Sequence, residues 1–295
     1  MTEAERRAAL EAIAEEVRVC TRCRLHETRT KAVPGEGDAS TEVMFVGEGP
    51  GMNEDREGRP FVGRAGGLLV TLLGHIGWFR DDVFITNIVK CRPPGNRDPE
   101  PDEIAACAPY LERQLQALDP SVVVTLGRYS MGRFMPGVRI SQAHGTTRIA
   151  DPATGARDAT VFAMYHPAAA LRTPAIERES YEDVALIPTV LTDARARRAE
   201  RRRAAAAAAA PPPGPAATPN VPAAEPASSP TPPDAEPAAD QLTRGQRPPD
   251  HLGRMRQDLV DDDLLRDGHQ GSVIHGSISL RRVRRSANRS RQNTP

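Results

Sequence analysis

All eleven aromatic residues of this 295-residue chain lie between Phe45 and Tyr181, and all four cysteines lie between Cys20 and Cys107. A segment without large aromatic side chains has little apolar surface from which to build a core. The sequence therefore predicts one globular domain, spanning residues 1–190, followed by a long segment that has no fold of its own.

The composition changes in steps after this domain. Residues 191–210 are rich in Arg and Ala and are predicted to continue from the domain as a helix. Residues 211–240 are rich in Pro and Ala, which indicates a disordered linker. Residues 241–295 contain acidic and basic blocks, which indicate a disordered tail. Since the formal net charge of the chain is zero, the composition gives no general signal for a polyanionic partner.

The sequence shows no sign of a membrane segment. No stretch is long and apolar enough to cross a bilayer, and the N-terminus lacks the apolar run of a signal peptide. We therefore expect a cytoplasmic protein with no membrane partner. In the cytoplasm four cysteines are more often metal ligands or free thiols than disulfides.

Short apolar runs alternate with amphipathic segments along the domain. Strands are predicted at residues 43–46, 83–89, 121–126, 146–149 and 160–164, and helices at residues 2–18, 66–76, 101–118 and 174–187. Thr2 and Glu5 form a candidate capping box for the first helix. This alternation is typical of an α/β fold, a three-layer α/β/α sandwich around a central, mainly parallel sheet.

The first strand runs into a glycine-rich turn, Gly47-Glu48-Gly49-Pro50-Gly51. In open α/β sheets ligands bind at the C-terminal ends of the strands, and glycines let a ligand come close to the backbone. The turn lacks the G-x-G-x-x-G order and Pro50 removes an amide, so the turn does not predict a nucleotide phosphate site. Taken alone, Glu48 is better explained as a solvated side chain in an ordinary turn.

Two further polar residues end predicted strands. Asn87 and His166 are placed at the same edge of the sheet as Glu48, which predicts that the three side chains converge on one pocket. Asn87 carries a donor and an acceptor on one planar group, which matches the edge of a nucleobase. Phe61 is a candidate to stack on a flat ligand, although a single Phe is more often part of the core.

The cysteines form one close pair and one distant pair. Two residues separate Cys20 from Cys23, and fifteen separate Cys91 from Cys107. Four thiolates suit zinc or an iron–sulfur cluster, and the spacing alone does not distinguish the two. A redox dithiol at Cys20 and Cys23 would leave the other two cysteines unexplained.

Four motifs follow one another within residues 5–188: Gly-Glu-Gly-Pro-Gly, Glu-Asp-x-x-Gly-Arg-Pro-Phe-Val-Gly, Asn-Ile-Val-Lys-Cys-Arg-Pro-Pro and His-Pro-Ala-Ala. With the four cysteines, they resemble the family 4 uracil-DNA glycosylases, bacterial and archaeal base-excision repair enzymes that carry a [4Fe–4S] cluster. Family 5 enzymes have an apolar residue at the position of Glu48. The covalent uracil-trapping relatives carry a reactive histidine after the third motif, and none stands there in this sequence.

The resemblance implies that the protein hydrolyses the N-glycosidic bond of uracil in DNA, releasing free uracil and leaving an abasic site. As catalytic residues, Glu48 would support attack of water on the sugar and His166 would donate a hydrogen bond to uracil O2. Phe61 would stack on the flipped base, Asn87 would read its edge, and Glu54 would crowd the C5 position against thymine. The implied substrate-binding residues are Gly47, Gly49, Glu54, Phe61 and Asn87.

The resemblance also implies how DNA and the cofactor are bound. Leu171 would act as a wedge in the duplex, beside Ala169 and with Arg172 near phosphate. The [4Fe–4S] cluster, with zinc as the alternative, would be held by Cys20, Cys23, Cys91 and Cys107. We expect a monomer that acts on single- or double-stranded uracil-containing DNA and is nucleoid-associated when bound. A non-catalytic metal-cluster protein that binds nucleic acid is the alternative function, and the sequence identifies no partner for the Pro-rich segment.

Overall fold

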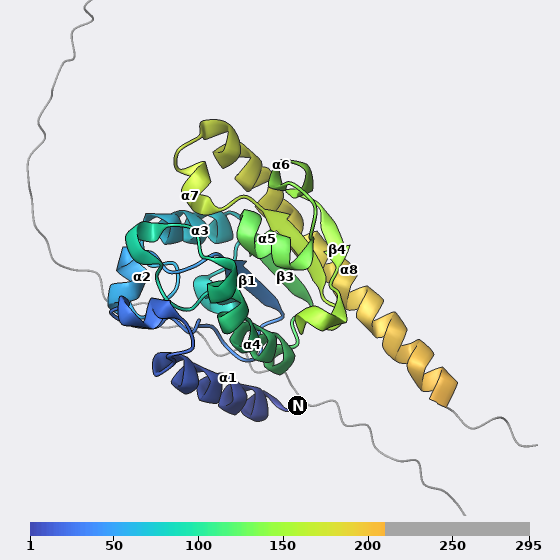
Figure 1. Cartoon of the computed structure of the whole chain (residues 1–295). Helices are drawn as coiled ribbons and strands as arrows, with labels where there is room; N and C mark the ends of the chain where they lie inside the picture. The colour runs from blue at the N-terminus through green and yellow to red at the C-terminus, as the bar shows by residue number, and fades with distance from the viewer. Residues whose placement is uncertain (210–295) are drawn as a thin grey trace, which may run out of the picture. The chain divides into compact units, whose positions relative to one another are not determined.

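The computed structural model describes residues 1–209, so the predicted linker at 211–240 and tail at 241–295 lie outside the described residues. A single five-stranded sheet has the strand order β2-β1-β3-β5-β4 (Figure 1). The strands are β1 (Val43–Gly47), β2 (Phe84–Asn87), β3 (Val122–Leu126), β4 (Thr147–Ile149) and β5 (Thr160–Met164). Neighbouring strands are parallel except for β4, which is antiparallel to β5.

Side chains of the strands alternate between two apolar layers. In β1, Met44 and Val46 belong to one layer and Val43 and Phe45 to the other. Residues of α1 (Glu3–Arg18), α4 (Pro101–Leu118) and α5 (Arg128–Phe134) pack in the first layer, and residues of α3 (Arg64–His75) and α8 (Pro174–Ala209) in the second. The predicted three-layer α/β/α fold is therefore confirmed.

Local sequence signals explain where several elements begin and end. The backbone N–H of Glu5 donates to Thr2 Oγ1 over 3.2 Å and the N–H of Thr2 donates to Glu5 Oε2 over 2.8 Å, so the predicted capping box is present. Strand β2 is shorter than predicted because its partner β1 already ends at Gly47. The backbone of Val89 still bonds to the carbonyl of Glu48 in the turn beyond.

Four short helices were not predicted: α2 (Met52–Glu57), α5, α6 (Ile140–Ala143) and α7 (Pro167–Ala170). They contain between four and seven residues, which is too short for a helical hydrophobic period to be recognised. Single 3₁₀ turns lie at Arg24–Glu27, Arg80–Asp82, Pro94–Asn96 and Pro152–Thr154.

The 36-residue helix α8 passes residue 190 without a break. Leu191 and Ala194 are buried in the second apolar layer. The guanidinium of Arg198 lies 3.1 Å from Asp119 Oδ1 and 3.0 Å from Asp158 Oδ1. The part of the chain that packs on the sheet therefore extends beyond the boundary placed at residue 190, and only the last turns of α8 project past the sheet (Figure 1). No helix within residues 1–209 is both long and apolar enough to cross a membrane.

Candidate active site and cysteine cluster

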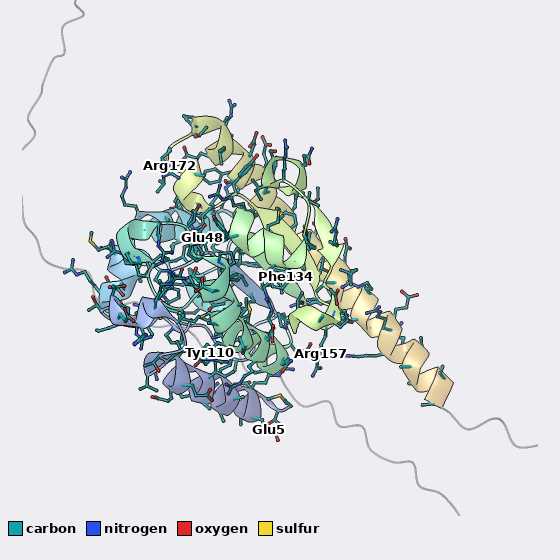
Figure 2. The ribbon with its side chains drawn as sticks, in the orientation of Figure 1. Glu5, Glu48, Tyr110, Phe134, Arg157 and Arg172 are labelled. Carbon is teal, nitrogen blue, oxygen red and sulfur yellow. The ribbon has the colours of Figure 1, made fainter. Side chains whose placement is uncertain are left out.

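A pocket of about 660 Å³ opens at the C-terminal edge of the parallel strands. Glu48 follows β1, Asn87 ends β2 and His166 follows β5, and all three side chains line this pocket. The topology brings them together as predicted, because the C-terminal ends of parallel strands share one edge. Glu48 and Arg172, both of which line the pocket, are labelled in Figure 2.

The side chain of Asn87 is buried, and its Oδ1 accepts no hydrogen bond from any residue in the described part of the chain. An unpaired buried acceptor costs free energy, typically about 1–3 kcal/mol. Such a group is satisfied when a ligand brings a donor. Asn87 Oδ1 is therefore an unpaired hydrogen-bond acceptor at the wall of the pocket, suited to an N–H group of a ligand.

Gly47 makes room for two of the side chains in this region. A Cβ at this position would lie 2.4 Å from Asn87 Oδ1 and 2.7 Å from Phe61 Cζ, both closer than any real contact. Phe61 itself has a φ of 49°, the left-handed region that non-glycine residues rarely adopt. Its ring is buried and stacks on the His166 ring, with centroids 5.7 Å apart and planes inclined by 30°.

The ring of His166 has a defined tautomer. Its Nδ1 accepts a hydrogen bond from the backbone N–H of Ala168 over 3.1 Å, so the proton of the neutral ring is on Nε2. The pKa of His166 is lowered to about 4, first by burial and then by the charge of nearby Arg172, against the opposing effect of Glu54. At neutral pH His166 is thus an uncharged donor through Nε2.

The carboxyl of Glu48 is half-buried beside an ion pair. Burial raises the pKa of Glu48, the negative charge of Asp98 adds to the rise, and the positive charge of Arg128 opposes it. Arg128 Nη2 donates to Asp98 Oδ2 over 2.5 Å, and both residues line the pocket. The carboxylate of Glu48 is therefore less solvated than an exposed carboxylate, and its electrostatic interactions with nearby charges are stronger.

Glu54 connects the loops around the pocket. Its Oε2 accepts from the N–H of Gly51 at 3.1 Å, and its Oε1 accepts from the N–H groups of Val62 and Gly63 at 2.9 and 2.8 Å. The side chain lines the pocket, and these three bonds hold the segment that carries Phe61. A position against C5 of uracil remains a prediction.

The residues predicted to contact DNA lie around α7. Ala169 and Arg172 line the pocket, whereas Leu171 lies outside it with 39% of its surface exposed. Sequence reasoning missed Asp98 and Arg128. Arg128 directly follows Gly127 at the end of β3, so the rule that placed Glu48 and Asn87 at strand ends would have found it.

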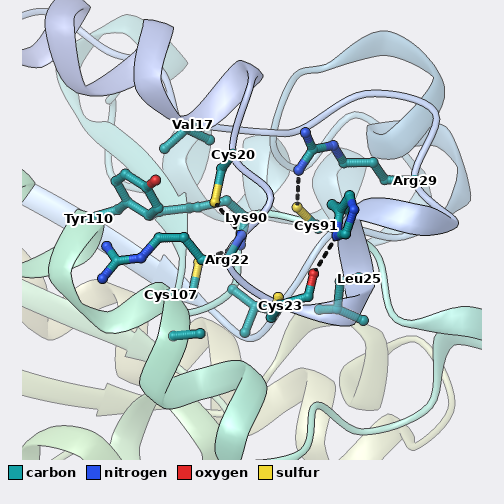
Figure 3. Close-up of a pocket in the computed structure, with 13 residues that line it drawn as sticks. Val17, Cys20, Arg22, Cys23, Leu25, Arg29, Lys90, Cys91, Cys107 and Tyr110 are labelled. Atoms are coloured by element: carbon teal, nitrogen blue, oxygen red, sulfur yellow. Dashed lines mark hydrogen bonds between the residues drawn. The ribbon is translucent and has the colours of Figure 1, made fainter.

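The four cysteines line a second pocket, shown in Figure 3. Cys20 and Cys23 follow α1, Cys91 follows β2, and Cys107 lies on α4. Three donors point at their sulfurs. These are Arg29 Nη1 to Cys91 at 3.1 Å, the N–H of Lys90 to Cys107 at 3.2 Å, and the N–H of Arg22 to Cys20 at 3.4 Å.

Burial keeps the thiols of Cys91 and Cys107 protonated at neutral pH. Burial raises the pKa of Cys91, and it raises the pKa of Cys107 to about 11, so these thiols ionise at neutral pH only when a metal displaces the proton. Within residues 1–209 no three His, Cys, Asp or Glu side chains are close enough together to hold one metal ion. The four sulfurs line one pocket and come from three separate segments of the chain.

The fold and the pocket together define a class of protein. A family model described as the uracil DNA glycosylase superfamily matches residues 34–187, which include all five strands. This match covers more than half of the chain, so the protein belongs to that superfamily.

Curated relatives define the family within that class. The chain is 50% identical over 183 residues to a type-4 uracil-DNA glycosylase of Sulfurisphaera tokodaii, a match covering 59% of this chain and 81% of that relative. For the type-4 enzyme of Saccharolobus solfataricus the identity is 48%, covering 62% and 87%. For that of Archaeoglobus fulgidus it is 45%, covering 59% and 88%. The chain is a member of the type-4 uracil-DNA glycosylases.

Proposed function

We propose that this glycosylase hydrolyses the N-glycosidic bond of uracil in DNA with Glu48 and His166 as its catalytic residues and Asn87 as the reader of the base. The observation that carries the proposal is that one pocket holds both an unpaired acceptor and an uncharged donor. Asn87 offers an unpaired buried acceptor, and His166 offers an uncharged Nε2 donor. Uracil has an N–H group between two carbonyl oxygens, which matches this set.

Binding of the base uses Asn87 and Phe61. A base inside a duplex is reached only after it leaves the stack, which costs a few kcal/mol. Contacts between the flipped base and the pocket offset part of that free energy. Asn87 Oδ1 accepts from uracil N3–H and its amide donates to O4. The ring of Phe61 stacks on the base, and the Glu54 bonds to Val62 and Gly63 keep the loop of Phe61 in place.

Departure of the base uses His166. Negative charge develops on uracil as the glycosidic bond breaks, and the Nε2–H of His166 donates to O2. The Ala168 N–H already holds the His166 ring in place, so the ring does not have to reorient as charge develops on the base. Because the bond to O2 strengthens as charge builds up, it favours the transition state over the ground state.

Reaction at the sugar uses Glu48. The carboxylate is partly desolvated. It stabilises the positive charge that develops on the sugar and orients the attacking water. Arg172 lies at the rim of the same pocket, where it is placed to contact a phosphate of the flipped nucleotide. Leu171 is exposed next to it and is suited to fill the space that the base leaves.

The donor set of the cysteine pocket fits a [4Fe–4S] cluster, in which each iron takes its own thiolate. Cys20, Cys23, Cys91 and Cys107 would hold it, and three donors already point at the sulfurs. Bound there, the cluster supplies a rigid link between α1, α4 and the segment after β2. No step of base excision needs it. Zinc is the alternative occupant, because four thiolates also form a common zinc site.

The test uses a labelled oligonucleotide with one uracil, treated with alkali after incubation, and a thymine oligonucleotide as control. We expect a break at uracil alone, in single- or double-stranded DNA. Iron and sulfide content and visible absorbance are measured on the same preparation. A preparation that is fully loaded with cluster and binds the oligonucleotide without breaking it would instead support a non-catalytic nucleic-acid-binding protein. We also propose that the protein is a monomer and acts on DNA in the cytoplasm.

A further inference from the structure

Lys90 has a fully buried side chain that carries three hydrogen bonds. Its Nζ donates to Thr86 Oγ1 over 2.6 Å, to Gln114 Oε1 over 2.6 Å and to the backbone carbonyl of Asn87 over 2.8 Å. All three acceptors are neutral oxygens. The ammonium group is thus saturated, and one of its partners is the backbone of the residue that presents the unpaired acceptor to the pocket.

The network extends to the segment that precedes β1 in the chain. Gln114, on α4, donates through its amide to the carbonyl of Pro34 over 2.7 Å, and Thr86 Oγ1 donates to the same carbonyl over 3.0 Å. The two side-chain acceptors of Lys90 are therefore themselves anchored to one further segment, at the carbonyl of Pro34. A displacement of the Asn87 carbonyl would break a bond to a group that cannot follow it.

The backbone of Lys90 lies at the cysteine pocket. Its N–H donates to Cys107 Sγ over 3.2 Å, its carbonyl accepts from the N–H of Val33 over 2.7 Å, and the next residue is Cys91 (Figure 3). One residue thus connects the cysteine cluster through its backbone with Asn87 through its side chain.

We propose that Lys90 is a positioning residue for base recognition: its ammonium group fixes the Asn87 peptide so that the Asn87 amide meets the edge of uracil. The inference rests on the proposed role of Asn87. Gly47 and Phe61 already confine the amide of Asn87 from one side. The hydrogen bond from Lys90 Nζ to the Asn87 carbonyl restricts what is still free, namely the tilt of the Asn87 peptide.

A lysine side chain buried among neutral acceptors is poorly explained by stability alone. Taking an ammonium group out of water costs several kcal/mol, and replacing buried charged groups by apolar residues of similar volume is often neutral or stabilising. A role in orientation accounts for the geometry, since a misplacement of about 1 Å in a reacting complex can cost about 100-fold in rate.

The test replaces Lys90 by Met, which keeps the length and removes the three bonds. We expect kcat/KM on a uracil oligonucleotide to fall about 10–100-fold. Inhibition by free uracil should weaken by about tenfold, while binding to an oligonucleotide with an abasic site stays unchanged. Iron and sulfide content should match the unaltered protein. Arg198→Met is the control, because it removes another buried cation, bonded to Asp119 and Asp158 far from Asn87.

Each alternative has its own signature. If Lys90→Met keeps the uracil inhibition constant, the proposal is wrong. The same holds if Lys90→Met loses iron, because Lys90 then acts through the cysteines. If Asn87→Ala leaves uracil inhibition intact, the proposed role of Asn87 has failed instead. Gln114→Leu, which removes one anchor of the ammonium group, provides a second variant in case Lys90→Met does not fold. It should weaken uracil inhibition in the same direction, and an unchanged constant overturns the proposal.

Discussion

The N–H of Ala168 donates to Nδ1 of His166 over 3.1 Å, one residue beyond the proline that follows the histidine. Because His166 is the N-cap of α7, the short helix supplies this donor and fixes the ring in the tautomer with hydrogen on Nε2. Burial keeps that ring uncharged at neutral pH. The histidine therefore acts by donating a hydrogen bond rather than by carrying a charge.

The first prediction concerns stability in acid. The pKa of His166 is lowered from its ordinary value of 6.5 to about 4 in the folded protein, so between these values the unfolded chain binds more protons. The contribution of the neutral ring is complete above pH 6.5 and is lost as the pH falls through about 4, a change of up to about 3 kcal/mol.

Urea unfolding at pH 7 and at pH 4 measures this contribution. The difference in free energy of unfolding between the native protein and His166→Gln should shift by that amount in favour of the variant at the lower pH. A difference that is independent of pH would show that folding does not lower the pKa of His166.

The second prediction concerns Glu48. We expect Glu48→Gln to lower kcat about 10²–10⁴-fold, with binding to abasic DNA preserved. Since burial raises the pKa of Glu48, ionising it in the folded state costs free energy at neutral pH. The variant should therefore be more stable than the native protein at pH 7, and the gain should disappear as the pH falls below the raised pKa. Full activity in Glu48→Gln would contradict the role given to this carboxylate.

Much of the site follows from the ends of the strands. Glu48, Asn87 and His166 were placed on one edge because apolar runs end just before them and parallel strands end together. That Oδ1 of Asn87 has no partner within the described residues could not be predicted from the sequence. It depends on Gly47 and on the left-handed Phe61, which only tertiary packing decides.

Lys90 shows a second limit of sequence reasoning. A lysine at the end of a strand is expected to be exposed, yet this side chain turns back to Thr86 and Asn87 of β2 and meets Gln114 on α4, a contact that only tertiary packing creates. The boundary at residue 190 was drawn from composition. Helix α8 continues because Leu191, Ala194 and Arg198 still meet the sheet, and an Arg/Ala-rich composition gives no sign of that packing.

The third prediction compares two glycines. A Cβ on Gly47 would collide with Asn87 and Phe61, whereas a Cβ on Gly67 in α3 would meet nothing within 4 Å. We expect Gly47→Ala to reduce kcat/KM at least about 100-fold by displacing the reading groups. Gly67→Ala should leave activity unchanged and add up to about 1 kcal/mol of stability through helix propensity. Equal activity in the two variants would rule out the crowding argument.

The fourth prediction concerns the length of α8. A chain ending at residue 190 loses the buried Leu191 and the ion pairs of Arg198, which should lower the free energy of unfolding by about 2–5 kcal/mol. A chain ending at residue 205 keeps both and should melt like the full protein. Thermal unfolding of the two shortened chains distinguishes these outcomes, and equal melting temperatures would show that α8 contributes nothing beyond residue 190.

The fifth prediction concerns Arg29, whose Nη1 donates to Cys91 Sγ over 3.1 Å and whose Nη2 donates to the carbonyl of Arg18. A charged donor stabilises a thiolate, so Arg29→Met should make the bound cluster more labile. Iron release to a chelator, followed by the loss of visible absorbance, is expected to be several-fold faster than in the native protein. Arg22→Met is the matched control, because Arg22 reaches Cys20 through its backbone N–H, which the substitution leaves in place. Equal release rates in both variants would mean that the guanidinium of Arg29 does not stabilise Cys91 as a ligand.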